Sequence, residues 1–217
     1  MNNKENVKKT VEEKESSNLL DDIQEYKETG PSREASKKLT NLDLIYCAII
    51  GVLGGIISSL IPFSLLIKIW YPLTGGTQLI SGHHVLWASI VYGISRKKRN
   101  ILFTMLTKGI IEFLLGDVWG LLIIFVNLME GACLAIGFFL MEKIGEGETK
   151  LGWGIAGGLG NFFQAPFFWI LNQRWALHWT LWVLAFMFAF ISGILIVGLL
   201  GRAAKNYLIK AGVPTTF

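Results

Sequence analysis

Charged residues are scarce in this sequence. They make up 17% of the 217 residues, whereas 52% are hydrophobic and the mean hydropathy is +0.49. Soluble globular domains carry about 25% charged residues. This deficit excludes an ordinary water-soluble domain and predicts an integral membrane protein.

The sequence also lacks the short motifs that carry most enzyme chemistry. It contains no Walker A loop, no GxSxG elbow, no HExxH and no CxxC. Its two cysteines, Cys47 and Cys133, each lie in an apolar run and indicate no disulfide framework. The adjacent His83 and His84 would point about 100° apart on a helix, so they do not predict a chelating pair. We therefore expect no metal, no cofactor and no catalytic activity.

The charges that are present divide the chain into two regions. Residues 1–40 hold 8 Lys and Arg and 9 Asp and Glu, which leaves 12 and 7 for the other 177 residues. A segment so polar buries too little apolar surface to fold alone. We expect a disordered cytoplasmic tail at 1–40 and a transmembrane domain at 41–217. No cleavable signal peptide precedes the first apolar run, so the tail should remain attached.

Long apolar runs fill the second region. A helix needs roughly 20 residues to cross the ~30 Å hydrocarbon layer of a bilayer. The fold class that this predicts is all-α, an integral membrane bundle of six transmembrane helices. The expected spans are 42–67, 78–94, 101–116, 117–141, 151–171 and 180–200, with polar residues and a proline interrupting the fifth.

Lysine and arginine between these spans predict the orientation, because short cation-rich loops stay in the cytoplasm. With six spans, all the cation clusters fall on one side: Lys37 and Lys38, Arg96 to Arg99, Lys143 and Lys150, and Arg202, Lys205 and Lys210. We therefore expect a multi-pass protein of the cell membrane with both termini in the cytoplasm. The sequence pI of about 9.0 then reflects topology, and no nucleic-acid partner is expected.

Charged side chains inside the spans are the first candidate functional groups, since each costs about 3 kcal/mol in the hydrocarbon core. Lys108 and Glu112 lie four residues apart on one helix face. They form either an internal ion pair or, with Glu112 facing an external cavity, part of a ligand site, and the two interpretations are compatible. Asp117 is placed to cap a helix start. Glu130 is too deep to cap a helix, and either pairs with another helix or lines the site or a subunit contact.

Aromatic residues concentrate on the predicted outer side. Seven of the eight tryptophans map there, namely Trp70, Trp87, Trp119, Trp169, Trp175, Trp179 and Trp182. Polar side chains that include Asn161, Gln164 and one of the paired histidines, His84, accompany them. Flat apolar faces with hydrogen-bonding groups between them suit a planar heterocycle, although a thickened interfacial belt would give the same distribution. The candidate substrate-binding residues are Glu112, Trp119, Trp87, His84, Asn161 and Gln164.

Small residues recur every four positions on two spans. Gly51, Gly55 and Ser59 form one such stripe, and Gly154 with Gly158 form another. Stripes of this kind allow close helix contacts in membranes. They serve either packing within this chain or, for Gly51, Gly55 and Ser59, contact with a separate membrane subunit.

The segment from Lys108 to Met141 resembles the third and fourth helices of the substrate-capturing S subunits of energy-coupling-factor (ECF) transporters. Its sequence is KGIIEFLLGDVWGLLIIFVNLMEGACLAIGFFLM. It is most similar to the YkoE-like branch, which is associated with thiamin and its hydroxymethylpyrimidine precursor. The shared pattern is a Glu followed by Leu-Gly-x-x-Trp-Gly, matched by Glu112, Leu115, Gly116, Trp119 and Gly120. Where the branch has Gln-Gly and a further Glu, this chain has Glu130-Gly131 and Ala135.

The resemblance implies a bilayer-embedded subunit that captures a vitamin or vitamin precursor at the outer face. It implies two kinds of partner for ATP-driven uptake, an ECF transmembrane coupling subunit and two ABC ATPases. Glu112, Trp119 and Trp87 would line the pocket, and Gly51, Gly55 and Ser59 would face the coupling subunit. A small membrane enzyme acting on a lipid or isoprenoid, with Glu112, Asp117 and Glu130 as its acids, is the alternative from another class. A membrane scaffold protein is a further alternative.

Overall fold

The protein is described by a computed structural model that covers residues 39–61, 78–171 and 178–215. The predicted disordered tail at 1–40 falls outside these residues except for its last two positions. Residues Leu39–Phe217 form one unit by their internal contacts.

All the regular structure in the described ranges is helical. The helices are α2 (Asn41–Leu60), α4 (His83–Ser95), α5 (Lys98–Leu114), α6 (Leu122–Lys143), α7 (Lys150–Phe162), α8 (Gln164–Leu171), α9 (Trp179–Leu195), the π-helical segment η3 (Ile196–Gly201) and α10 (Arg202–Lys210). Three helical stretches are long and apolar enough to cross a membrane: Asn41–Leu60, Leu122–Lys143 and Trp179–Lys210. The predicted all-α membrane bundle is confirmed.

Helix α2 begins at a reciprocal cap that joins Thr40 and Asp43. The Asp43 backbone N–H donates to Thr40 Oγ1 at 3.2 Å, and the Thr40 N–H donates to Asp43 Oδ2 at 2.8 Å. This capping box satisfies two backbone donors at the helix start. It also fixes the Asp43 carboxylate, which contacts a second helix as described below.

The fifth predicted span is two helices rather than one. Helix α7 ends at Phe162, and α8 begins two residues later at Gln164. Pro166 lies in the first turn of α8, where a missing backbone N–H costs no intrahelical hydrogen bond. The break places Asn161 and Gln164 on either side of the junction.

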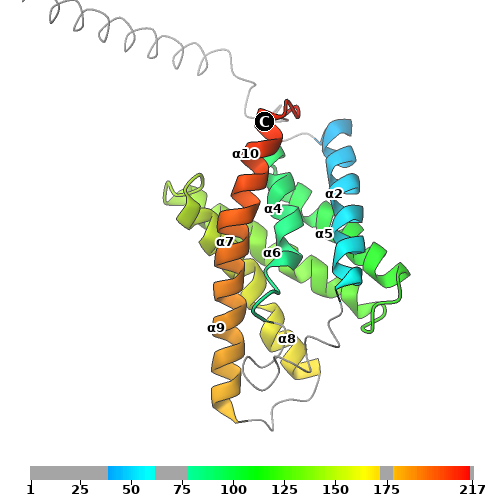
Figure 1. Ribbon diagram of the computed structural model, residues 1–217, viewed down its shortest axis with the longest axis vertical. Coiled ribbons are helices and arrows are strands. Elements are labelled where there is room, and N and C mark those ends of the chain that lie inside the picture. Colours follow the sequence, from blue (N-terminus) through cyan, green and yellow to red (C-terminus); the bar gives the residue numbers. More distant parts are fainter. Residues whose placement is uncertain (1–38, 62–77, 172–177, 216–217) are drawn as a thin grey trace, which may run out of the picture. The chain divides into compact units, whose positions relative to one another are not determined.

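The helices form a chain of neighbours around a central element. Helices α2, α5, α6, α7 and α9 pack in that order, and α4 contacts α2, α5 and the continuous α9–η3–α10 rod (Figure 1). The hydrophobic core surrounds α4 and comprises Val85, Ala88, Tyr92, Ile101, Met105, Leu134, Phe138, Met141, Trp153, Ala156 and Val197. Helix α4 is therefore the buried centre of the bundle, and its first turn carries His83 and His84.

Glycines permit the closest helix contacts, as the small-residue stripes predict. On α7, a Cβ at Gly158 would lie 2.8 Å from the Phe190 ring, and one at Gly154 would lie 3.1 Å from Ile194 Cγ2. On α2, a Cβ at Gly51 would lie 2.8 Å from the Thr104 carbonyl oxygen, and one at Gly55 would lie 2.7 Å from Ile111 Cβ. Both stripes are therefore used for packing within the chain.

This packing corrects the predicted partner interface on α2. Gly51 and Gly55 are buried against α5, so their side of α2 is not available to a separate subunit. Ser59, the third residue of that prediction, is exposed, and its hydroxyl donates to the Gly55 carbonyl oxygen at 2.9 Å. Spacing along one helix identified the close contact but not the helix that makes it.

Candidate substrate-binding site

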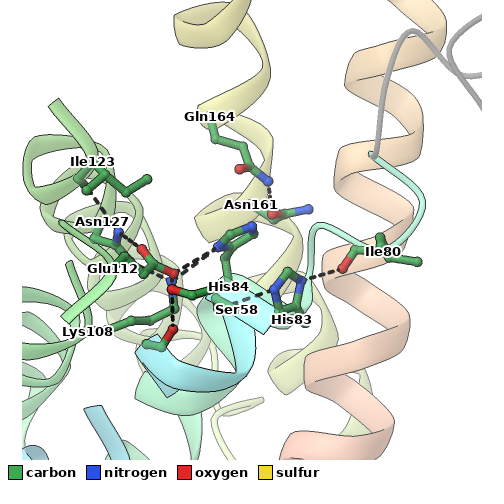
Figure 2. A network of polar contacts seen from close by, with 12 residues as sticks. Ser58, Ile80, His83, His84, Lys108, Glu112, Ile123, Asn127, Asn161 and Gln164 are labelled. Atoms are coloured by element: carbon green, nitrogen blue, oxygen red, sulfur yellow. Dashed lines mark hydrogen bonds and ion pairs between the residues drawn. The ribbon is translucent and has the colours of Figure 1, made fainter. Parts of the chain in front are cut away.

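The Lys108 ammonium lies at the centre of a buried polar cluster. It donates to Glu112 Oε1 at 2.6 Å, to Asn127 Oδ1 at 2.8 Å and to His84 Nδ1 at 3.2 Å (Figure 2). An ammonium has three N–H donors, so these three acceptors use all of them. Lys108 is fully buried, and its charge is compensated inside the bundle rather than by water.

Glu112 and Asn127 hold each other in place across α5 and α6. The Asn127 side-chain amide donates to Glu112 Oε2 at 2.6 Å and to the Ile123 carbonyl oxygen at 2.9 Å. Both residues are only 1% exposed. Two acceptors, Glu112 Oε1 and Asn127 Oδ1, consequently point at the same point in space, which the Lys108 ammonium occupies. The predicted pairing of Lys108 with Glu112 is present in the structure.

The two histidines of α4 diverge, as adjacent helical residues must. His84 faces the cluster, whereas His83 Nε2 lies 3.3 Å from Ser58 Oγ on α2 and His83 Nδ1 lies 2.9 Å from the Ile80 carbonyl oxygen (Figure 2). The His84 side chain is 16% exposed, which makes it the most exposed wall of the cluster. Because Lys108 can only donate, His84 Nδ1 accepts, and the neutral ring carries its proton on Nε2.

Glu130 lies on the same helix as Asn127, three residues further on. It is 1% exposed, and neither carboxylate oxygen has a hydrogen-bond partner among the described residues. The charges of Lys108 and Glu112 act on it electrostatically. A buried polar group left without a partner is unusual in a native structure and indicates a functional demand.

Asn161 and Gln164, predicted to bind substrate, instead form a second polar cluster. The Asn161 amide donates to Ser81 Oγ at 2.7 Å and to the Ala189 carbonyl oxygen at 2.6 Å, and Gln164 donates to Asn161 Oδ1. Asn161 is fully buried and Gln164 is 2% exposed. These contacts join α7, α9 and the turn before α4.

Trp87 and Trp119, also predicted to bind substrate, lie on different elements, α4 and the turn between α5 and α6. Trp87 lies one helical turn after His83 on α4. Its ring packs against Gly54 of α2, where a Cβ would lie 2.6 Å from the ring. Trp119 is half-buried in the turn between α5 and α6, and its backbone N–H donates to Asp117 Oδ1 at 2.8 Å. Trp87 is therefore a packing residue between α2 and α4.

Asp117 lies in a tight turn before α6 and does not cap that helix. Gly116 and Gly120 flank it with φ angles of +83° and +55°, which only glycine adopts without strain. Burial raises the pKa of the Asp117 carboxyl, whereas the hydrogen bond from Trp119 acts in the opposite direction. The sequence predicts that Asp117 caps the next helix. In the structure its carboxylate instead accepts from a backbone N–H within the turn.

The remaining predicted outer aromatics lie only partly within the described ranges. Trp70 and Trp175 fall outside them. Helices α7 and α9 form an apolar groove of about 400 Å³ lined by Leu159, Phe162, Val183, Phe186, Met187 and Phe190. With no polar lining side chain, this groove does not suit a hydrogen-bonding ligand, and it is separate from the Lys108 cluster.

Basic residues gather at the end of the bundle away from the Lys108 cluster. We call it the cation-rich end and define it by Arg96 to Arg99, Lys143, Lys150 and Lys205. Lys97 Nζ donates to Asp43 Oδ2 at 2.8 Å, which joins the start of α2 to the α4–α5 turn. Glu148 contacts both Arg96 and Lys205, which joins that turn to α10. Glu148 lies between Lys143 and Lys150 in the chain, so its two ion pairs bring three of the four predicted cation clusters together.

The sequence and the structure were compared with known proteins. Residues 42–144 match the family described as "ABC-type cobalt transport system, permease component". No curated protein matches the sequence. A solved structure titled "Crystal structure of an S-component of ECF transporter" superposes with a TM-score of 0.73 at 18% identity, covering 81% of this chain and 88% of that chain.

The chain has the fold of an ECF transporter S component. The S-component fold agrees with the predicted helical membrane architecture and with the resemblance noted in the sequence. Both comparisons are with components of transporters. Neither comparison names thiamin or hydroxymethylpyrimidine.

Asn127 is the site residue that the sequence analysis missed. Its signal was a polar residue three positions before a buried acid on the same helix, so that Asn127 and Glu130 share a face. Its role became visible only with the packing of α5 on α6, where a Cβ at Gly109 would lie 3.2 Å from Asn127 Cβ.

Proposed function

We propose that this protein is the substrate-binding membrane subunit of an ECF-type importer. It captures a nitrogen-containing vitamin or vitamin precursor, of the thiamin or hydroxymethylpyrimidine type, at the outer face of the cell membrane. The observation that carries this proposal is the buried convergence of Lys108, Glu112, Asn127 and His84. ATP hydrolysis belongs to two separate ABC ATPases, which a transmembrane coupling subunit connects to this chain.

The geometry of the acceptors supports the ligand class. Glu112 Oε1 and Asn127 Oδ1 both accept from one ammonium, at 2.6 and 2.8 Å. A ligand group with two N–H donors, such as an aminopyrimidine, satisfies the same pair. Exclusion of water makes such charge-assisted hydrogen bonds stronger than at a surface.

The distribution of cations supports the orientation. Short loops rich in Lys and Arg usually face the cytoplasm, which supports an orientation with the cation-rich end and both termini on the cytoplasmic side. Helix α5 runs from Lys98 at that end to Leu114, and Lys108 and Glu112 lie toward its far end. The cluster then sits in the outer half of the membrane, as capture from outside requires.

A divalent metal is the alternative ligand that the matched family's description raises. Two observations favour an organic ligand. Among the described residues, no group of three or more His, Cys, Asp and Glu side chains could hold a metal ion. The acceptors of Glu112 are also already neutralised by a lysine within the same cluster.

Binding to the purified protein in lipid nanodiscs tests the proposal. Isothermal titration with thiamin, hydroxymethylpyrimidine and Co²⁺ should show binding of an organic ligand. Glu112→Gln should weaken that binding about tenfold to a hundredfold, because a charge-assisted hydrogen bond contributes about 1.5–3 kcal/mol.

The matched control is Glu148→Gln, which removes a half-exposed carboxylate at the cation-rich end and should leave affinity unchanged. Thermal unfolding of each variant confirms that it is folded. Equal affinity of the wild type and Glu112→Gln for every organic ligand would refute the site, and binding of Co²⁺ alone would replace the ligand class.

A further inference from the structure

Two buried ionisable groups of the site differ greatly in how many hydrogen bonds they make. Lys108 donates three hydrogen bonds, whereas Glu130 has no hydrogen-bond partner for either oxygen among the described residues. Both side chains are at most 1% exposed, so water does not compensate Glu130. A buried acid without a hydrogen-bond partner destabilises the fold and requires an explanation. A second arrangement of the cluster, in which Glu130 gains a partner, supplies one.

The packing of α5 on α6 places Glu130 at the level of Lys108. A Cβ at Gly109 would contact Ile124 and Asn127, and a Cβ at Gly131 would contact Met105. Glu130 therefore lies beside the turn of α5 between Met105 and Gly109, which contains Lys108. Asn127 and Glu130 share one face of α6, with Cβ atoms about 5–6 Å apart at this spacing. A lysine has a flexible four-carbon stem, and the Lys108 ammonium already contacts α6 at Asn127, about one helical turn from Glu130.

We propose that Lys108 is a displaceable cation that occupies the ligand's place between Glu112 and Asn127, and that Glu130 is the carboxylate that receives it when the ligand binds. This inference rests on the proposed function for the location of the ligand. It assigns Lys108 two positions, one beside Glu112 in the free protein and one beside Glu130 in the complex.

The exchange specifies the ligand group. Whatever displaces the ammonium must leave Glu112 compensated, so it carries positive charge or polarised N–H donors, and it must present two of them to Glu112 Oε1 and Asn127 Oδ1. Protonated aminoheterocycles, amidinium groups and primary ammonium groups meet this requirement. A neutral ligand without N–H donors does not, because it would leave the Glu112 carboxylate buried and unpaired.

The exchange also accounts for binding in a closed cluster. Removal of a buried ammonium from its partners ordinarily costs several kcal/mol. If Lys108 moves to Glu130, the charge remains paired and the ligand takes over the vacated acceptors. Glu130 thus acts on the ligand through Lys108 and is a positioning residue rather than a direct contact.

A stability cycle without ligand tests the second position of Lys108. Glu112→Gln imitates the complex, because it removes the charge that retains Lys108 at the first position. In this background Lys108→Met should lower the Tm, since it breaks a Lys108–Glu130 pair. In the Glu112→Gln, Glu130→Gln background the same substitution should not lower the Tm, because Lys108 then has no charge partner to lose, and the two effects should differ by at least about 5 °C.

The control is Glu142→Gln in place of Glu130→Gln. Glu142 is an acid of the same helix that bonds Tyr92 and Lys98 at the cation-rich end, so it should show no coupling to Lys108. An equal effect of Lys108→Met with and without Glu130 would overturn the inference. Each result compares two backgrounds, so a general loss of stability in one variant does not mimic the coupling.

A binding measurement with thiamin tests the exchange itself. Glu130→Gln should weaken binding about tenfold, because the displaced Lys108 then has no partner. Adding Lys108→Met to Glu130→Gln should restore at least part of this loss, since nothing remains to be displaced. No restoration would overturn the exchange. If the wild type binds no thiamin, the proposed ligand fails, while the stability cycle still decides whether Lys108 has two positions.

Discussion

Asp43 and Glu130 are both buried carboxylates, and the difference between their surroundings separates the two ends of the bundle. Asp43 is fully buried, and both of its oxygens accept hydrogen bonds, Oδ1 from Asn100 and Oδ2 from Lys97 and Thr40. Glu130 is 1% exposed and uses neither oxygen among the described contacts. A buried carboxylate thus joins two helices at the cation-rich end, whereas another makes no hydrogen bond among the described residues beside the candidate site.

The largest expected effect on stability is at Asp43. Asp43→Ala removes the α2 cap and leaves the Lys97 ammonium, whose side chain is 5% exposed, without its charge partner. Breaking a buried pair on one side costs about 3–5 kcal/mol, so thermal unfolding in detergent should shift down strongly. Ligand affinity of the protein that remains folded should be unchanged. A small shift would show that the fastening role is wrong.

A smaller loss of stability is expected at Asn127. Asn127→Leu removes the amide that donates to Glu112 and accepts from Lys108, and each of these charge-assisted bonds contributes about 1.5–3 kcal/mol. The Lys108–Glu112 ion pair remains and leucine fills the space of the amide, so the Tm should fall less than for Asp43→Ala, and ligand binding should be lost as well. Ser59→Ala, at an exposed position of α2, is the control and should change neither quantity. An unchanged affinity would remove Asn127 from the site.

The smallest effect is expected at Glu148, which also lies at the cation-rich end. Its side chain is 55% exposed although it contacts Arg96 and Lys205. Exposed pairs contribute about 0–1 kcal/mol, so Glu148→Gln should lower stability only slightly, and 1 M salt should abolish the difference from the wild type. A loss as large as that of Asp43→Ala would show that exposure does not separate these two ion pairs.

Much of the fold could be predicted from the sequence, because hydrophobic runs and loop cations report on the membrane directly. Of the expected spans, the second, third, fourth and sixth each overlap one described helix or the α9–η3 rod, the fifth is divided between α7 and α8, and part of the first is described as α2. The pairing of Lys108 with Glu112 was predictable for a similar reason, since residues four apart on a helix are neighbours.

Contacts between helices were not predictable from spacing alone. Asn161 and Gln164 looked like ligand-binding groups, yet they satisfy Ser81, a carbonyl of α9 and each other. Gly51 and Gly55 correctly indicated a close helix contact, but the partner is α5 of the same chain. In both cases the residue type follows from the need to pack or pair, whereas the identity of the partner follows from the tertiary arrangement.

The rod from Trp179 to Lys210 touches both ends of the molecule. Near one end the Ser192 hydroxyl accepts from the Gly82 backbone N–H, directly before the two histidines, and near the other Lys205 bonds Glu148. The π-helical segment Ile196–Gly201 lies between these two attachment points. One continuous helical element therefore connects the turn before the histidines to the cation-rich end, and its one irregular segment is of a rare kind that is frequently found at functional sites.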